Sequence, residues 1–276
     1  MLHKRAKLIS ALVALTNKEC WSLPGKGLML KVEPANLIYE GLCGIKLPPL
    51  ARPPVGPFDD PTEDLILWGL RDYAYSSIAH IRTILSGLMD LAASGNQPTI
   101  FIVCRHVFEW TMHSCYMAQM MDQHFKNLDW KAAWDLFLEV DTGNSWIKKH
   151  GSKYWSLVDS EDVPNSVRIA KLVKAYEKHQ MGTHGSQDVK DSYGYLSEHA
   201  HANGACFLSY RRLSGPEVSF VEAPKVHGFP GVLHASIIEW LMFIYGILGL
   251  CKEDLVRLQI LTIIKQLAQM AREEQA

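Results

Sequence analysis

The sequence predicts an all-α fold: a multi-helix bundle with a small β-hairpin insertion and an N-terminal arm. Long segments repeat apolar residues at helical spacing or are apolar on every side. Six prolines crowd into residues 47–61 and separate an arm with its Pro-rich connector, residues 1–61, from a bundle domain, residues 62–276. The composition, 48% hydrophobic and 21% charged, is typical of a globular protein with a sizeable core.

The first 20 residues are expected to form an amphipathic helix, because three leucines share one helical face. A basic start and a short apolar run also resemble an export signal. However, polar residues follow that run at 16–19, where a cleavage site needs small side chains. Residues 21–47 are mixed in character, and a short strand is expected at 28–32.

Five helices are expected between the connector and residue 180. Asp60 or Thr62 can cap the first helix, and Pro61 suits its first turn. The sequence SGNQP at 94–98 ends that helix. The expected helical ranges are 62–93, 99–125, 129–140, 144–158 and 164–180.

The second half of the chain is expected to begin with a helix over 193–203, which reads YGYLSEHAHAN. Two short extended runs then flank a turn, Ser-Gly-Pro-Glu, within 207–222, which predicts the small hairpin. Two helices, 232–251 and 252–274, complete the bundle.

Residues 232–251 are apolar and long enough to span a bilayer. They contain His234 and Glu239, and a charge near the middle of a span costs about 3 kcal/mol. We therefore expect a buried core helix and no membrane span.

The net charge and the spacing of the cysteines limit the possible functions. The formal net charge is −1, so the chain has no global basic field that would attract nucleic acid, although a local patch stays open. Six cysteines are scattered without a C-x-x-C pair, which argues against a structural zinc site and a disulfide framework. Free thiols of this kind are typical of a reducing compartment, which predicts a cytoplasmic protein.

Two polar rows on apolar helices suggest a site. In the first, Arg105 and Glu109 are one helical turn apart within 99–125, and His106 and His113 flank them. Buried charges need partners, so the pair is expected to form a salt bridge. That bridge could satisfy itself in the core without any further role.

The second row comprises Tyr193, Ser197 and His201, stacked at i, i+4 and i+8. If the two rows face each other, they satisfy each other's hydrogen bonds and form one partly buried cluster, bordered by Tyr193 and Tyr116. The candidate catalytic residues are His201, Arg105, Glu109 and Ser197, and the candidate ligand-binding residues are Tyr193, Tyr116, His106 and His113.

The segments 105–109 (RHVFE) and 196–201 (LSEHAH) resemble the Arg-x-x-x-Glu and Leu-Ser-x-x-x-His signatures of an uncharacterised bacterial family of all-helical proteins. The resemblance follows the order of elements over about residues 65–201 and implies that the two signature helices pair. It implies no established activity.

A looser similarity links the chain to HEPN domains, helical bundles that include RNA-cleaving toxins. Their signature is an arginine followed, after four to six residues, by a histidine, and it is usually completed across a dimer. Arg105 and His113 are too far apart for this spacing, and no arginine precedes His201 at the required distance.

The residue patterns for metal binding and for covalent catalysis are incomplete. His106, Glu109 and His113 recur at i, i+3 and i+7, but they do not complete a metal-ligand set of known type, so no metal and no cofactor is predicted. Ser197 and His201 could act as nucleophile and base, with Glu109 orienting the imidazole. No G-x-S-x-G turn surrounds this serine, and the chain has no phosphate-binding glycine motif.

Two classes of function therefore stay open. One is a non-catalytic helical module that binds a ligand or protein partner in a bacterial stress or defence setting. The other is a ribonuclease or nucleotide-acting enzyme, in which His201 transfers protons and Arg105 stabilises phosphate charge. The near-zero net charge and the incomplete catalytic motifs favour the binding module. RNA as a partner and a homodimer remain open.

Overall fold

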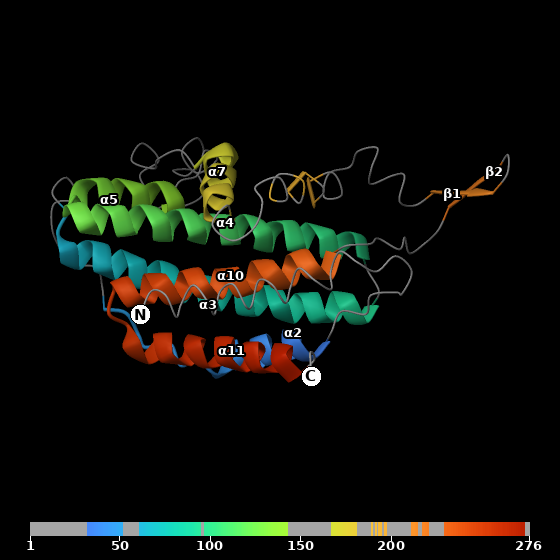
Figure 1. Ribbon diagram of the computed structural model, residues 1–276, viewed down its shortest axis with the longest axis horizontal. Helices are drawn as coiled ribbons and strands as arrows, with labels where there is room; N and C mark the ends of the chain where they lie inside the picture. Colours follow the sequence, from blue (N-terminus) through green and yellow to red (C-terminus); the bar gives the residue numbers. More distant parts are fainter. Residues whose placement is uncertain are drawn as a thin grey trace, which may run out of the picture.

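The computed structural model describes residues 32–51, 61–94, 97–142, 167–180, 189, 191, 193–194, 196–197, 211–214, 217–220 and 229–273. Within these residues the chain is a bundle of seven α-helices, and the all-α prediction is confirmed. Figure 1 shows α2 and α11 along one side, α3 and α10 in the middle, and α4 and α5 along the other side. The middle layer is thus covered on both faces.

Helix α3 (Glu63–Ser94) begins where the cap signals predict. The backbone amide of Leu65 donates to Thr62 Oγ1 at 3.4 Å, and Glu63 and Asp64 occupy the first turn, where negative charge complements the helix dipole. Trp68 Nε1 donates to the carbonyl of Ala51 at 2.8 Å and ties the end of the described connector to this helix.

Helix α4 (Gln97–Asn127) is the long apolar helix expected over 99–125. Phe101, Val107 and Phe108 have exposed fractions of only 2%, 0% and 4%, which confirms that this helix belongs to the core. It ends at Asn127, the φ of 55° at Leu128 then turns the chain, and Asp129 accepts from the amide of Ala132 at 3.0 Å.

Asp129 caps α5 (Trp130–Phe137), which continues into the π-helical turn η1 (Leu138–Thr142). The regular helix is therefore shorter than the expected 129–140. The widened turn carries Val140, which lies beside residues of α4.

Helix α7 (Ile169–Gln180) covers α4, and α10 (Phe229–Leu250) crosses the centre, in contact with α3, α4 and α11. Trp240, Leu241 and Ile244 of α10 are fully buried. Among the described helices, none combines the length and apolarity that crossing a membrane requires.

Helix α11 (Asp254–Glu273) follows α10 after a tight turn at Lys252, whose φ is 59°. It packs on both α10 and α2 (Val32–Gly44). The sequence led us to expect a mixed segment over 21–47, whereas 32–44 is helical and Ile38 and Leu42 are completely buried. Residues 28–31 of the expected strand lie outside the described residues.

Arg82 of α3 fixes the end of α2. Its guanidinium donates to the carbonyl of Leu42 in the last turn of α2 and to that of Ile45, just after the helix, each at 2.6 Å. The described part of the N-terminal region is therefore packed into the bundle core.

Two short strands, β1 (Arg211–Ser214) and β2 (Glu217–Phe220), pair antiparallel, with Ser214 opposite Glu217. The predicted helices at 1–20 and 144–158 lie outside the described residues, as does His201.

Candidate functional site

The first polar row forms the salt bridge that its spacing predicts. Arg105 Nε donates to Glu109 Oε1 at 2.9 Å, and the side chains are 22% and 28% exposed. Tyr193, from the second predicted row, joins them. Its hydroxyl donates to Glu109 Oε1 at 3.2 Å and accepts from Arg105 Nη2 at 3.3 Å. These two predicted rows therefore meet at Tyr193.

The bridge keeps Arg105 charged. Burial lowers the pKa of the Arg105 guanidinium, but Glu109 and the Tyr193 hydroxyl outweigh it, and the net direction is upward. The Tyr193 ring also lies 5.7 Å from the guanidinium carbon, within the range of a cation–π contact.

Ser197, like Tyr193, has a helical backbone. Its Oγ is buried and has no hydrogen-bond partner among the described residues, and its neighbour Leu196 is buried in the core. The position of His201 falls outside the described residues, so the cluster predicted from Arg105, Glu109, Ser197 and His201 is described only in part.

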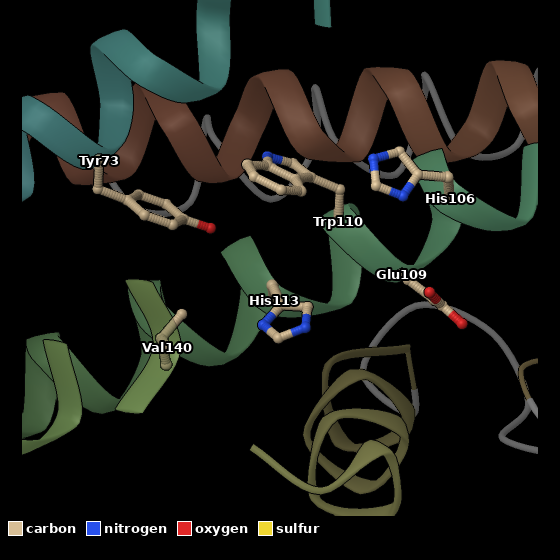
Figure 2. Close-up of a pocket in the computed structure, with 6 residues that line it drawn as sticks. All are labelled: Tyr73, His106, Glu109, Trp110, His113 and Val140. Atoms are coloured by element: carbon tan, nitrogen blue, oxygen red, sulfur yellow. The ribbon is translucent and has the colours of Figure 1, made fainter. Parts of the chain in front are cut away.

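A pocket of about 210 Å³ opens beside this bridge, between α3, α4 and η1. It is lined by Tyr73, His106, Glu109, Trp110, His113 and Val140. Figure 2 shows Tyr73 and Val140 toward one end, His106 and Glu109 toward the other, and Trp110 and His113 between them. Three predicted site residues, His106, Glu109 and His113, thus share one cavity.

The aromatic walls of the pocket are braced by polar contacts between α3 and α4. The Tyr73 and Ser114 hydroxyls lie 3.0 Å apart, and Trp110 Nε1 donates to Ser77 Oγ at 3.3 Å. His80 packs on the Trp110 indole, with ring centroids 4.6 Å apart. These contacts hold the rings in place before any ligand arrives.

Two imidazoles at the site, those of His113 and His80, favour their neutral forms. Burial lowers the pKa of His113 from its ordinary value of 6.5; Glu109 opposes this shift and His106 adds to it. Burial and then His106 lower the pKa of His80 in the same direction. Nε2 of His80 and Nε2 of His106 lie 2.8 Å apart, so one ring donates to the other.

The sequence missed three of the lining residues, Tyr73, Trp110 and Val140. Trp110 is half-buried and shares the pocket with His106 and His113, three or four residues away on the same helix. That spacing could have predicted that Trp110 lines the pocket, whereas nothing in the sequence indicates that Tyr73 or Val140 does.

Tyr116, predicted to bind ligand, is half-buried and does not line this pocket. Within the described part of the chain, no group of three or more histidine, cysteine, aspartate or glutamate side chains is placed to hold a metal ion.

No protein-family model, curated protein or solved structure matches this chain. The assignment of a function therefore depends on the geometry of the site.

A second polar contact lies deeper, between α7 and α10. The Tyr176 hydroxyl donates to the Glu239 carboxylate, and both side chains are buried. Close by, Gln119 Nε2 donates to the carbonyl of Ala175 at 3.3 Å and ties α4 to α7. These contacts join three helices through the core.

Proposed function

We propose that this protein is a helical module that binds a small organic ligand in the pocket between α3, α4 and η1. The observation that carries the proposal is the cavity of about 210 Å³ itself. It combines the Trp110 and Tyr73 rings with a few fixed polar groups, which is the usual chemistry of a small-molecule site. Its size, below the about 300–1,000 Å³ of pockets for drug-sized compounds, suits a compact ligand.

Binding fits the lining better than catalysis. None of the described lining residues is a serine, cysteine, threonine or lysine, so the nucleophiles that they offer are a carboxylate, a phenol and two imidazoles. The Tyr73 phenol is already paired with Ser114. The Glu109 carboxylate is already paired with Arg105.

The cellular location and the biological role that we propose for this module are based on the sequence. We propose a cytoplasmic protein in a bacterial stress or defence system, with an arm over residues 1–61 and a small hairpin inserted in a bundle domain over residues 62–276. The partner of this module would be another protein or a second copy of the chain.

A screen of ring-containing fragments by thermal shift tests the proposal. Val140→Trp places an indole in the pocket, and we expect it to abolish the stabilisation that fragments give to the wild type. Leu258→Trp is the matched control, because Leu258 is 59% exposed on α11, away from the pocket. Binding that survives Val140→Trp unchanged, or no binding by any fragment, would refute the ligand-binding module.

The second candidate is an HEPN-like ribonuclease or nucleotide-acting enzyme. It is favoured by the charged Arg105 beside Tyr193, because the predicted helix that carries Tyr193 also carries His201. In this proposal Arg105 stabilises phosphate charge and His201 acts as general acid or base.

Expression of wild type and His201→Ala in bacteria tests the enzyme. Growth arrest with fragmented RNA in the wild type, lost in the variant, supports it. Equal growth and intact RNA in both cultures would exclude it under those conditions and leave the binding module.

A further inference from the structure

The polar atoms that the pocket can offer to a ligand indicate the chemical class of that ligand. The first of them is a carboxylate oxygen of Glu109. Both of its hydrogen bonds in the described structure, from Arg105 and from Tyr193, fall on Oε1. Oε2 accepts no hydrogen bond from the described residues. The carboxylate therefore offers a ligand one acceptor, in contrast to the two-oxygen fork that binds a guanidinium.

His113 lies one helical turn after Glu109 and lines the same pocket. Its neutral ring carries one N–H donor and one acceptor nitrogen. By contrast, His106 Nε2 is already paired with His80. Glu109 and His113 thus offer the same pocket an acceptor and a group that can donate.

The aromatic residues contribute surface and few hydrogen bonds. The Trp110 indole N–H is directed to Ser77, and the Tyr73 hydroxyl is paired with Ser114. A flat ring between these walls would gain stacking and apolar contact. These walls suit a planar ligand with a polar edge that can reach Glu109 and His113.

The charges at the pocket argue against charged ligands. Glu109 is the single formally charged side chain among the described lining residues, and Arg105 neutralises it from outside the lining. A phosphate or carboxylate would find no cation among the described lining residues, and an ammonium ion would find a carboxylate whose charge Arg105 already neutralises. A neutral ring is the better match.

We infer that the pocket binds a planar nitrogen heterocycle with an amino group next to a ring nitrogen, the edge that adenine and cytosine share. The amino group donates to Glu109 Oε2, and His113 donates to the ring nitrogen. This inference rests on the proposed ligand-binding function and names its ligand class.

Calorimetric titration with adenine tests the inference, with N6,N6-dimethyladenine and hypoxanthine as comparisons. Dimethylation removes the amino donors, and hypoxanthine replaces the amino group with a carbonyl acceptor. We expect adenine to bind at least about tenfold more tightly than either, in line with the loss of one or more base-edge hydrogen bonds. Equal binding of all three would overturn the inference.

Glu109→Gln sharpens the test because it turns an acceptor into a donor. With the glutamine oxygen held by Arg105, the amide NH₂ faces the ligand and can donate to the hypoxanthine carbonyl, while the acceptor nitrogen of the neutral His113 ring can accept from the hypoxanthine N1–H. The variant should therefore prefer hypoxanthine over adenine. Glu253→Gln is the matched control: Glu253 is also a partly buried carboxylate, bonded to Arg71 at 2.7 Å and to Tyr75 at 2.8 Å, and does not line the pocket. An unchanged preference in Glu109→Gln would contradict the assigned contact.

The results of these experiments distinguish a wrong ligand class from a wrong proposed function. If ring fragments bind the wild type and not Val140→Trp, while adenine binds neither, the ligand class is wrong and the binding module stands. If AMP binds more tightly than adenine, the neutral free base is not the preferred ligand, and the inference is overturned. If no compound binds the wild type, the proposed function itself fails.

Discussion

At the scale of single residues, the bridge between Arg105 and Glu109 ties α4 to Tyr193. Removing the guanidinium leaves a partly buried carboxylate with one remaining donor among the described residues, the Tyr193 hydroxyl. Because both side chains are about a quarter exposed, the cost should be moderate and less than that of breaking a fully buried pair.

We predict that Arg105→Met lowers the free energy of unfolding by about 1–2 kcal/mol. Urea denaturation of the wild type and variant measures the change. Glu109→Gln is the companion variant, and the double variant should lose less than the sum of the two single losses. Strict additivity would show that the two side chains do not interact in solution.

The sequence predicted the pairing of Arg105 with Glu109 because their spacing is fixed by one helix. Trp110 shows the limit of that reasoning. It is one residue from Glu109, yet its surroundings come from Ser77 and His80 on α3. Helical periodicity assigns a face to a residue and does not say which partner covers that face or whether a pocket forms there.

At the scale of elements, α2 and α11 approach closely at Gly41. A Cβ at this position would lie 2.6 Å from Ile263 Cγ1, and Ile263 is buried, so it has little room to move. Gly44, at the end of the same helix, has open space where an added Cβ would lie, with no atom within 4 Å of it.

We predict that Gly41→Ala destabilises the fold by about 1–3 kcal/mol through overpacking. Gly44→Ala is the control and should be neutral or slightly stabilising, because alanine favours helix over glycine. Thermal or urea unfolding compares the two variants. If both behave alike, α2 does not pack on α11 as described.

A second prediction at this scale concerns the contact between α7 and α10. Tyr176→Phe removes a donor from the buried Glu239 carboxylate, and we expect a loss of about 1–3 kcal/mol in the free energy of unfolding. Tyr39→Phe provides the comparison, because the Tyr39 hydroxyl makes no hydrogen bond with the described residues. Equal stability of the two variants would contradict the contact.

Helix limits were predictable where caps and breakers mark them. The first bundle helix was expected over 62–93 and spans 63–94. By contrast, α2 was missed: Glu33 and Pro34 in its first turn are helix-start signals, but the preceding apolar run and glycines suggested a strand. The π-helical turn after α5 has no clear local signal and depends on its packing.

At the scale of the whole molecule, three partly buried histidines couple stability to pH. Burial lowers the pKa of His80, His113 and His179 from the ordinary 6.5. Between the lowered folded values and 6.5, the unfolded chain binds more protons than the folded one. Their stabilisation is therefore complete above pH 6.5 and is lost as pH falls through the folded pKa values.

We predict that the midpoint of urea unfolding decreases from pH 7.5 to pH 5. His113→Gln should reduce this dependence, because one of the three contributing groups is removed. Equal midpoints at both pH values, or a higher midpoint at pH 5, would show that these imidazoles are not held neutral in the folded protein.

Binding of a small planar ligand in the pocket between α3, α4 and η1 can be tested most directly by a ¹H–¹⁵N spectrum of the tryptophan indole groups during titration with adenine. The Trp110 signal is assigned through Trp110→Phe. We expect a saturable shift of the Trp110 signal and none for Trp240, which is fully buried in α10. A Trp110 signal that does not move at saturating adenine or with any ring fragment would contradict it.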